Sequence, residues 1–441
     1  MGSDDPRRHV PRTDAVLSAP DVAAAVERLG RDLVKAVVVT VLDACRRGDV
    51  TPAAVVETVV AALPPSASSL RPVINATGVI VHTNLGRAPL SEAAIEAVRR
   101  AAGATDVELD LTTGRRGRRG AAALAAIVAR VPDAGGVHVV NNGAAALALT
   151  ASVLARGREI VIARGELVEI GDGFRIPELL ESVGARLREV GTTNRVSLAD
   201  YERAIGPDTG FVLKVHPSNF RVEGFTSSVP VTDLATLGVP VVADIGSGLL
   251  APHPRLPDEP DATTALRDGA TVVTASGDKL LGGPQCGLLL GTADVVERLR
   301  RDPFARALRV DKLTLAALEA TLAGPIAPVP AALAADPEQL MARARRLVSL
   351  VGGDLAHAVE TSGRVGGGGA PGVPIPSAGI TLPAALAVPL RTGGSPVVGR
   401  VSEGRLVLDL LAVPPAADEA IAAAVRAVAM TAGTPTEAPC T

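Results

Sequence analysis

The middle of the chain alternates between short apolar runs and longer amphipathic stretches. The apolar runs, which are typical of buried strands, lie near Val137, Ile160, Phe211, Val239 and Thr271. Helical periodicity lies between them, for example over residues 144–154 and 198–205. Alternation of strand and helix at this spacing predicts a mainly parallel sheet with helices on both faces, from Val73 to about Gly324.

A small helical unit is predicted before this alternation. Ser18-Ala-Pro-Asp21 is a typical helix start, and we expect one helix from there to about Arg47. Thr51-Pro52 begins a second, shorter helix that ends before Pro64-Pro65. These signals predict an N-terminal helical domain over residues 1–65.

The C-terminal part of the chain follows a Pro-rich break at residues 325–330. The elements expected after it are a helix over 337–351, a glycine run at Gly366–Gly369, alternating strands at 397–401 and 405–410, and a helix from about Ala417. This order predicts a large α/β domain over residues 66–325 and a smaller α+β domain over residues 326–441.

Composition limits the class of protein. Hydrophobic residues make up 47% of the 441 residues but aromatic residues only 1%, so Val, Leu, Ile and Ala must form the core. The net charge of −3 favours no DNA partner. Cys45, Cys286 and Cys440 are scattered, which predicts neither a disulfide framework nor a metal site. The polar N-terminus and the lack of an uncharged apolar run of roughly 18 residues predict a cytoplasmic protein without a membrane partner.

One of the four lysines lies in a sequence that suits amine chemistry. An apolar run, Ala270 to Ala275, leads into Lys279, and two leucines and two glycines follow it. A partly desolvated lysine has a lowered pKa and can form a Schiff base, which arginine cannot do. The alternative is a surface lysine in a Gly-Pro turn.

A carboxylate ends the preceding apolar run. Val239-Pro-Val-Val-Ala-Asp244 is followed by a glycine turn that reaches Gly248. Because functional groups of open α/β sheets gather at the carboxyl ends of strands, we expect Asp244 and Lys279 to lie close together. Pyridoxal phosphate needs both groups, a lysine for its aldehyde and a carboxylate that keeps its pyridine nitrogen protonated. The alternative for Asp244 is a helix N-cap or a turn acid.

A third element precedes these two. Asn142 and Gly143 form a tight turn between a predicted strand and an alanine-rich helix. Backbone N–H groups at such a helix start bind phosphate, helped by the helix dipole. The order of this turn, Asp244 and Lys279 matches the fold-type I, aspartate aminotransferase-like arrangement of pyridoxal-phosphate enzymes.

Several segments carry a family resemblance. They are Arg71–Ser91, Leu109–Gly117, Val215–Thr226, Thr274–Gly287, Arg306–Thr314, Arg391–Val398 and Gly404–Leu410. On these segments the chain resembles the bacterial selenocysteine synthases, the L-seryl-tRNA(Sec) selenium transferases. The resemblance runs in register from Arg71 to about Val413, whereas the N-terminal unit matches only in size and helical character.

The resemblance implies a pyridoxal-phosphate enzyme that converts L-seryl-tRNA(Sec) to L-selenocysteinyl-tRNA(Sec) with selenophosphate, through an aminoacrylyl-tRNA intermediate. The implied catalytic residues are Lys279 and Asp278. The implied cofactor-binding residues are Asn142, Gly143, Ala144, Asn219, Asp244, Ser276 and Lys279. The implied selenophosphate pocket consists of Arg87, Arg119, Arg306 and Arg309. Guanidinium groups suit this compact polyanion because they bind its oxygens in bidentate fashion, although a solvated basic face is the alternative.

The resemblance also implies partners. The N-terminal unit is expected to bind the tRNA elbow, and the chain is expected to form a homo-oligomer, a decamer built from five dimers. The expected phosphate contacts of the N-terminal unit are Arg7, Arg8, Arg12, Arg28 and Arg31. The chain departs from the family pattern at Arg118 and at Cys286, whose thiol we interpret as a small buried hydrophobic group.

Two other functions stay open at this point. The first is a lyase on the same scaffold that acts on a free small amino acid or amino sugar phosphate. The N-terminal unit argues against it, because such relatives tend to lack one. The second is a catalytically silent RNA-binding protein, and the intact Asp244, Lys279 and Arg87 argue against that.

Overall fold

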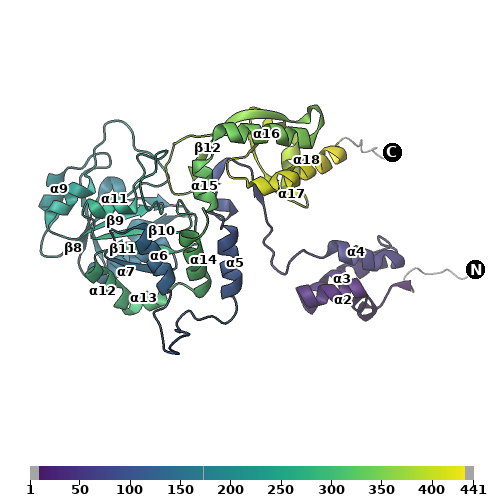
Figure 1. The fold of residues 1–441 in the computed structure, drawn as a ribbon, viewed down its shortest axis with the longest axis horizontal. Helices are drawn as coiled ribbons and strands as arrows, with labels where there is room; N and C mark the ends of the chain where they lie inside the picture. Colours follow the sequence, from purple (N-terminus) through teal and green to yellow (C-terminus); the bar gives the residue numbers. More distant parts are fainter. Residues whose placement is uncertain (1–8, 172, 433–441) are drawn as a thin grey trace, which may run out of the picture. The chain divides into compact units, whose positions relative to one another are not determined.

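The computed structural model describes residues 9–171 and 173–432. The chain divides into two compact units, Met1–Pro72 and Val73–Thr441, and each is described here by itself (Figure 1). The boundary between them lies close to the end of the predicted N-terminal domain. Cys440, Arg7 and Arg8 lie outside the described residues.

The first unit is a helical bundle with its own core. Its helices are α1 (Thr13–Leu17), α2 (Pro20–Leu29), α3 (Arg31–Arg47) and α4 (Val55–Ala62). Val22, Val38, Leu42 and Val59 are buried between them. The expectation of one helix to Arg47 is wrong, because Gly30 has φ +90 and separates α2 from α3. Glycine adopts this conformation at no steric cost, so the chain turns there.

A seven-stranded sheet organises the larger part of the second unit. Its strands are β3 (Gly136–Val140), β4 (Glu159–Ala163), β7 (Arg186–Val190), β8 (Thr209–Val215), β9 (Val241–Gly246), β10 (Val272–Ser276) and β11 (Gly287–Gly291). The order across the sheet is β3-β11-β10-β9-β8-β4-β7. β11 runs antiparallel to both neighbours and the other pairs are parallel. The predicted fold class, with a mainly parallel sheet, is confirmed.

Helices cover both faces of this sheet, because its central strands are apolar on both sides. One face packs against α7 (Gly143–Leu154), α8 (Ile176–Ser182), α12 (Ala293–Arg301) and α13 (Pro303–Ala307). The other face packs against α6 (Ala121–Arg130), α9 (Leu198–Ala204), α10 (Val231–Leu234), α11 (Ala262–Arg267) and α14 (Lys312–Ala323). In β10, Val272 belongs to the first core and Val273 to the second.

The C-terminal part of this unit forms a smaller α+β layer. Its sheet has the order β15 (Arg400–Ser402), β16 (Arg405–Asp409), β13 (Ile375–Pro383), β12 (His357–Gly366) and β2 (Val79–Val81). β1 (Ile74–Asn75) pairs with β14 (Val397–Val398). Its helices are α15 (Pro328–Ala334), α16 (Pro337–Val351), α17 (Ala387–Thr392) and α18 (Asp418–Ala432). Residues 74–81, from the predicted large domain, therefore pair with strands of the predicted small domain.

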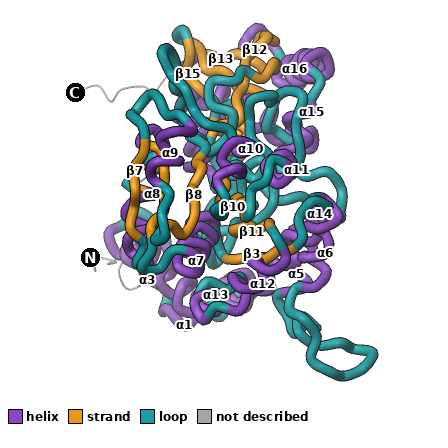
Figure 2. The backbone as a smooth tube through the Cα atoms, turned by 90° about the vertical axis from the view of Figure 1, so that its left-hand side faces the viewer, coloured by secondary structure: helices purple, strands orange, loops and turns teal. Residues whose placement is uncertain are grey.

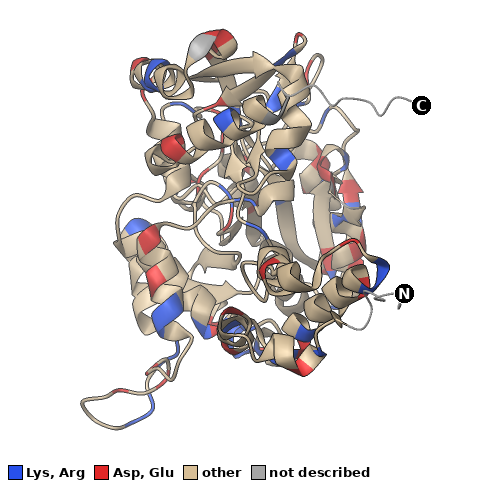
Figure 3. Cartoon of the chain, turned by 90° about the vertical axis from the view of Figure 1, so that its right-hand side faces the viewer, with Lys and Arg blue, Asp and Glu red and all other residues tan. Residues whose placement is uncertain are grey.

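Two peripheral features lie near the sheet. A short ribbon joins β5 (Glu169–Ile170) and β6 (Phe174–Arg175). A loop connects α5 (Glu92–Ala101) to α6 and extends away from the body of the unit (Figure 2). Acidic and basic residues are interspersed along the visible helices and occur in this loop as well (Figure 3).

Within the described residues, one apolar stretch, Lys312–Ala334, is long enough to cross a membrane by length and composition alone. It forms two helices, α14 and α15, with a break over residues 324–327. Leu318 and Leu322 of α14 are buried in the core beside the sheet. The stretch therefore contributes to a packed interior.

Candidate active site

Lys279 and Asp244 come from neighbouring parallel strands, as the sequence predicts. Thr274 of β10 pairs with Asp244 of β9, and its Oγ1 donates a 2.7 Å hydrogen bond to the Asp244 carboxylate. Lys279 follows the end of β10 by three residues. The Leu280 amide donates to the Ser247 carbonyl oxygen at 2.8 Å, which joins the two strand-end loops. Both functional groups therefore lie at the carboxyl edge of the sheet.

Burial shifts the pKa values of both groups in the direction that favours their uncharged forms. It raises the pKa of Asp244, and the Thr274 hydroxyl and the Lys279 charge oppose that rise. It also lowers the pKa of Lys279, which the negative charges of Asp244 and Asp278 oppose. A buried carboxylate with so few partners suits a protonated ring nitrogen, and a lysine with a lowered pKa suits amine chemistry.

The start of α7 forms a cradle for an anion. Asn142 caps the helix, since its side chain accepts a 2.8 Å hydrogen bond from the Ala145 amide. The amides of Gly143 and Ala144 have no acceptor within the helix and remain available. A Cβ on Gly143 would lie 2.5 Å from the Ser276 Oγ atom, so the hydroxyl lies directly against the helix start. These residues fit the phosphate of a cofactor.

Arg87 is held beside the lysine by Asp278. Its Nη1 atom donates a 2.7 Å hydrogen bond to the Asp278 carboxylate, whose side chain is 9% exposed. The Ala88 amide donates to the Asp278 carbonyl oxygen at 3.2 Å. Arg87 has φ +65, a left-handed conformation that is uncommon for a residue with a side chain. The backbone turn between His82 and Arg87 therefore holds Arg87 in this conformation, in which its guanidinium group points at Asp278.

The other three predicted arginines line one pocket of about 490 Å³ at the free edge of β3. Arg119 donates to the Val310 carbonyl oxygen at 3.0 Å and to Glu108 at 3.2 Å. Arg309 lies 3.6 Å from the same carboxylate, and Arg306 is exposed at the pocket. Arg87 is not among the described residues that line this pocket, so the structure brings together three of the four arginines.

The arginine pocket and the cofactor cradle both lie at the end of the sheet where β3 and β10 terminate. Ser276 pairs with Gly287, Gly287 pairs with Val140, and Val140 forms a bridge to Arg309. Three steps between neighbouring strands span roughly 14 Å. The α7 start, which follows Val140 directly, lies at this end of the sheet too. A substrate anion and a bound cofactor could therefore approach each other there.

Asn219, one of the predicted cofactor residues, follows β8 in the chain. The structure places it in an exposed turn after β8. Its neighbour Ser218 is buried, and a Cβ on Gly246 would lie 3.9 Å from the Ser218 side chain and 4.0 Å from Lys279 Nζ. The Ser218 side chain and the lysine amine therefore both lie close to Gly246. Sequence reasoning missed Ser218 because the turn direction depends on packing against Gly246.

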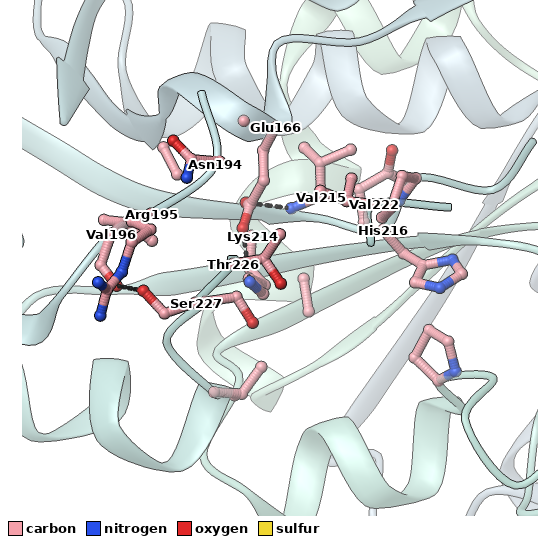
Figure 4. Close-up of a pocket in the computed structure, with 18 of the residues that line it drawn as sticks. Glu166, Asn194, Arg195, Val196, Lys214, Val215, His216, Val222, Thr226 and Ser227 are labelled. Carbon is pink, nitrogen blue, oxygen red and sulfur yellow. Dashed lines mark hydrogen bonds and ion pairs between the residues drawn. The ribbon is translucent and has the colours of Figure 1, made fainter. Parts of the chain in front are cut away.

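A second pocket, of about 370 Å³, lies at the same end of β8 and β9 (Figure 4). A buried ion pair between Glu166 and Lys214 contributes to its wall. Glu166 also accepts a 2.9 Å hydrogen bond from the Val215 amide. Burial raises the pKa of Glu166, and the Lys214 charge opposes that rise. No local sequence pattern indicates this pair, because 48 residues separate its members.

Cys286 packs behind the lysine segment. It is buried, and a Cβ on Gly277 would lie 2.4 Å from its Sγ atom. Burial raises the pKa of this thiol to about 12. A thiol that stays protonated at neutral pH is a poor nucleophile, which supports its interpretation as a small hydrophobic group.

Fold and site together define the class of protein. A solved D-glucosaminate-6-phosphate ammonia-lyase has a similar structure, with a TM-score of 0.59 and 19% sequence identity, over 83% of this chain and 97% of that chain. At this identity the likeness concerns the fold. The second unit therefore shares the α/β fold of that structure, in agreement with the predicted fold class.

Sequence comparison narrows the class to one family. The model of the L-seryl-tRNA selenium transferase family matches residues 73–414, and the model of the selenocysteine synthase N terminal region matches residues 7–46. The L-seryl-tRNA(Sec) selenium transferase of Moorella thermoacetica is 46% identical over 383 residues, which cover 81% of each chain. That of Solidesulfovibrio magneticus is 42% identical over 444 residues, 91% of this chain and 94% of the relative. The chain belongs to this family, and the predicted resemblance is confirmed.

Proposed function

We propose that this chain converts L-seryl-tRNA(Sec) to L-selenocysteinyl-tRNA(Sec), with pyridoxal phosphate as cofactor and selenophosphate as selenium donor. The observation that carries the proposal is the separate match of residues 7–46 to the selenocysteine synthase N-terminal region. A lyase that acts on a free small molecule needs no such unit. The match of residues 73–414 adds the catalytic scaffold to it.

The residues of the site fit pyridoxal phosphate. Lys279 would hold the cofactor aldehyde, and Asp244 would keep the ring nitrogen protonated, a role that suits a partly buried carboxylate with a single hydroxyl donor. The amides of Gly143 and Ala144 and the Ser276 hydroxyl would hold the cofactor phosphate. When bound, the cofactor supplies an electron sink for the charge left on the serine α-carbon.

The chain's own groups then move the protons. The amine of Lys279 accepts the serine α-proton, because its lowered pKa increases the neutral fraction at neutral pH. Asp278 and Arg87 stay paired beside it and fix the orientation of the lysine segment. The α-proton and the β-hydroxyl leave together as water. The selenium of selenophosphate then bonds to the β-carbon while the α-carbon regains a proton, and water cleaves the selenium–phosphorus bond and releases phosphate.

Selenophosphate binds at the arginine pocket. Arg119, Arg306 and Arg309 present guanidinium groups that match the oxygens of a compact polyanion. Glu108 pairs with Arg119 and Arg309 and keeps them oriented before the anion arrives. Arg87 extends this set from the lysine side of the site.

The N-terminal unit binds the tRNA. Arg12, Arg28 and Arg31 are exposed on it. Arg28 donates to the Pro65 carbonyl oxygen at 2.7 Å, and Arg31 lies 3.9 Å from Asp14. Such exposed interactions cost little to exchange for a phosphate contact. We also propose a homo-oligomer built from dimers, with a decamer as the expected mass in analytical ultracentrifugation.

The visible absorbance of the purified protein tests the function. We expect a cofactor band that shifts when seryl-tRNA(Sec) is added and that ignores free serine. A band that responds to free serine and ignores the charged tRNA would instead establish the small-molecule lyase. Lys279→Ala should remove the lysine-bound band, whereas the matched variant Lys312→Ala should keep it.

A further inference from the structure

The glycine run of the C-terminal region covers Lys279. Gly366 and Gly369 face each other across a tight turn at the end of β12. Gly368 has φ +84, and a Cβ on it would lie 2.6 Å from Lys279 Nζ and 2.7 Å from its Cδ and Cε atoms. Only a residue without a side chain fits so close to the lysine. The turn therefore forms one wall around the reactive amine.

Glu259 holds this turn from the opposite side. It lies in the loop between β9 and α11, its side chain is 1% exposed, and its Oε2 atom accepts a 2.6 Å hydrogen bond from the Ala370 amide. Ala370 has φ +43, a left-handed conformation that residues with a Cβ rarely adopt. A buried, charge-assisted hydrogen bond is stronger than a neutral one and holds such a backbone in place.

The other oxygen of Glu259 faces a histidine. Oε1 lies 3.9 Å from Nδ1 of His216, and neither atom has a hydrogen-bond partner among the described residues. Burial, followed by the Lys214 charge, lowers the pKa of His216 to about 4, so this ring is neutral at neutral pH. His216 therefore supplies no charge that would neutralise the Glu259 carboxylate.

Lys279 is the cation on which Glu259 acts. Burial raises the pKa of Glu259, and the Ser247 hydroxyl, the Ala370 amide and the Lys279 charge, in that order, lower it. Four charged groups act on Lys279 in addition to its burial, namely Asp244, Asp278, Arg87 and Glu259. Asp278 is paired with Arg87 and Asp244 is reserved for the ring nitrogen, so Glu259 is the carboxylate without another assigned role.

On the basis of the proposed function, we propose that Glu259 is a positioning residue for Lys279. Its carboxylate holds the Gly366–Ala370 turn against the lysine, and its negative charge favours the protonated Lys279 nitrogen. Substitution separates the two effects. A glutamine keeps an acceptor oxygen for the Ala370 amide but removes the charge, whereas an alanine removes both.

A pH titration of the visible absorbance of the full-length, cofactor-loaded protein tests this inference. Glu259→Gln should lower the midpoint pH of the absorbance change by about one unit, because the protonated nitrogen loses a nearby negative charge. Glu259→Ala should lower it as well and should also weaken cofactor binding about tenfold or more, because the turn loses its hydrogen bond. The control is Asp258→Asn, which removes the same charge from an exposed neighbouring position and should keep the wild-type midpoint.

The outcomes separate this inference from the proposed function. A wild-type midpoint in Glu259→Gln overturns the inference, whatever the alanine variant does. Failure of the wild-type chain to take up pyridoxal phosphate refutes the proposed function instead.

A second pair of variants tests the turn without touching Glu259. Gly368→Ala should weaken cofactor binding, because the added methyl group meets Lys279. Gly404→Ala should not, because Gly404 has a similar left-handed φ of +73 but a Cβ on it would meet nothing within 4 Å. Wild-type cofactor binding by Gly368→Ala would overturn the contact between turn and lysine.

Discussion

The close approach of Gly143 to Ser276 gives the sharpest test of the cofactor cradle. Gly143 is the first residue of α7, and a Cβ on it would lie 2.5 Å from the Ser276 Oγ atom but 3.8 Å from the Ser276 Cβ atom. Non-bonded heavy atoms normally lie about 3.5–4.0 Å apart. Gly143→Ala must therefore move the hydroxyl or the helix start by roughly 1 Å.

The expected cost follows from this overlap. Overpacking of a well-packed site costs about 1–3 kcal/mol. If that cost falls on the arrangement that binds the cofactor, the dissociation constant for pyridoxal phosphate rises about 5- to 150-fold. Gly143 does not have a left-handed φ. The substitution therefore introduces no backbone strain, and the whole effect belongs to the contact with Ser276.

A double-mutant cycle measures that contact. Cofactor titrations followed by absorbance would give dissociation constants for wild type, Gly143→Ala, Ser276→Ala and the double variant. Ser276→Ala removes the oxygen that clashes with the added methyl group. The double variant should therefore bind the cofactor more tightly than Gly143→Ala does. It should still lack the contribution of the Ser276 hydroxyl to cofactor binding. Gly394→Ala is the matched glycine control.

Two results would refute this reasoning. Wild-type affinity in Gly143→Ala would mean that the helix start tolerates a methyl group, and the cradle would not be as close as the structure has it. Additive losses in the double variant would mean that Gly143 and Ser276 act independently. In either case the phosphate would have to bind elsewhere.

Three further predictions concern the other parts of the site. Lys279→Ala should abolish formation of selenocysteinyl-tRNA and leave tRNA affinity nearly unchanged, because the lysine lies in the catalytic unit; turnover near the wild-type rate would rule out the assignment. Arg309→Glu should reduce selenium transfer more than loss of the β-hydroxyl, since the charge reversal repels selenophosphate; equal losses in the two steps would contradict the pocket assignment. Arg28→Ala combined with Arg31→Ala should weaken tRNA binding and make it less dependent on salt, as measured by filter binding at several ionic strengths; an unchanged salt dependence would show that these two residues make no phosphate contact.

The central sheet could largely be predicted because its strands are buried on both faces. Such strands are continuous apolar runs, as in β8 and β9. β11 escaped prediction because its glycines and leucines resemble the turn that follows Lys279, and hydrophobic periodicity does not reveal a reversal of strand direction. The long strand β12 is largely exposed and carries polar residues, and the mostly buried strand β13 is interrupted by prolines, serine and glycine, so neither is a continuous apolar run.

The site was predictable where its residues lie at strand ends and not where they depend on distant packing. Asp244 and Lys279 end successive apolar runs, and the parallel order of β9 and β10 brings them together. Glu259 and Ala370 are 111 residues apart and lie in loops that follow strands of two different sheets, so no local sequence pattern links them. The position of Ser218 beside Gly246 likewise depends on how the turn after β8 packs, which the local sequence does not reveal.

The shared scaffold explains why the site alone does not select the substrate. The structural likeness to the D-glucosaminate-6-phosphate ammonia-lyase extends over 97% of that chain but over 83% of this one. A lysine, a carboxylate and a phosphate cradle at the edge of one sheet suit many reactions at an amino-acid α-carbon, because the cofactor supplies the difficult chemistry. Discrimination must then come from what surrounds them. Here that is a basic pocket at the same end of the sheet, suited to a compact anion, and a separate helical unit whose exposed arginines suit a sugar-phosphate backbone. A free amino acid could use neither, whereas a transferase that joins a tRNA-bound serine to a selenium anion needs both.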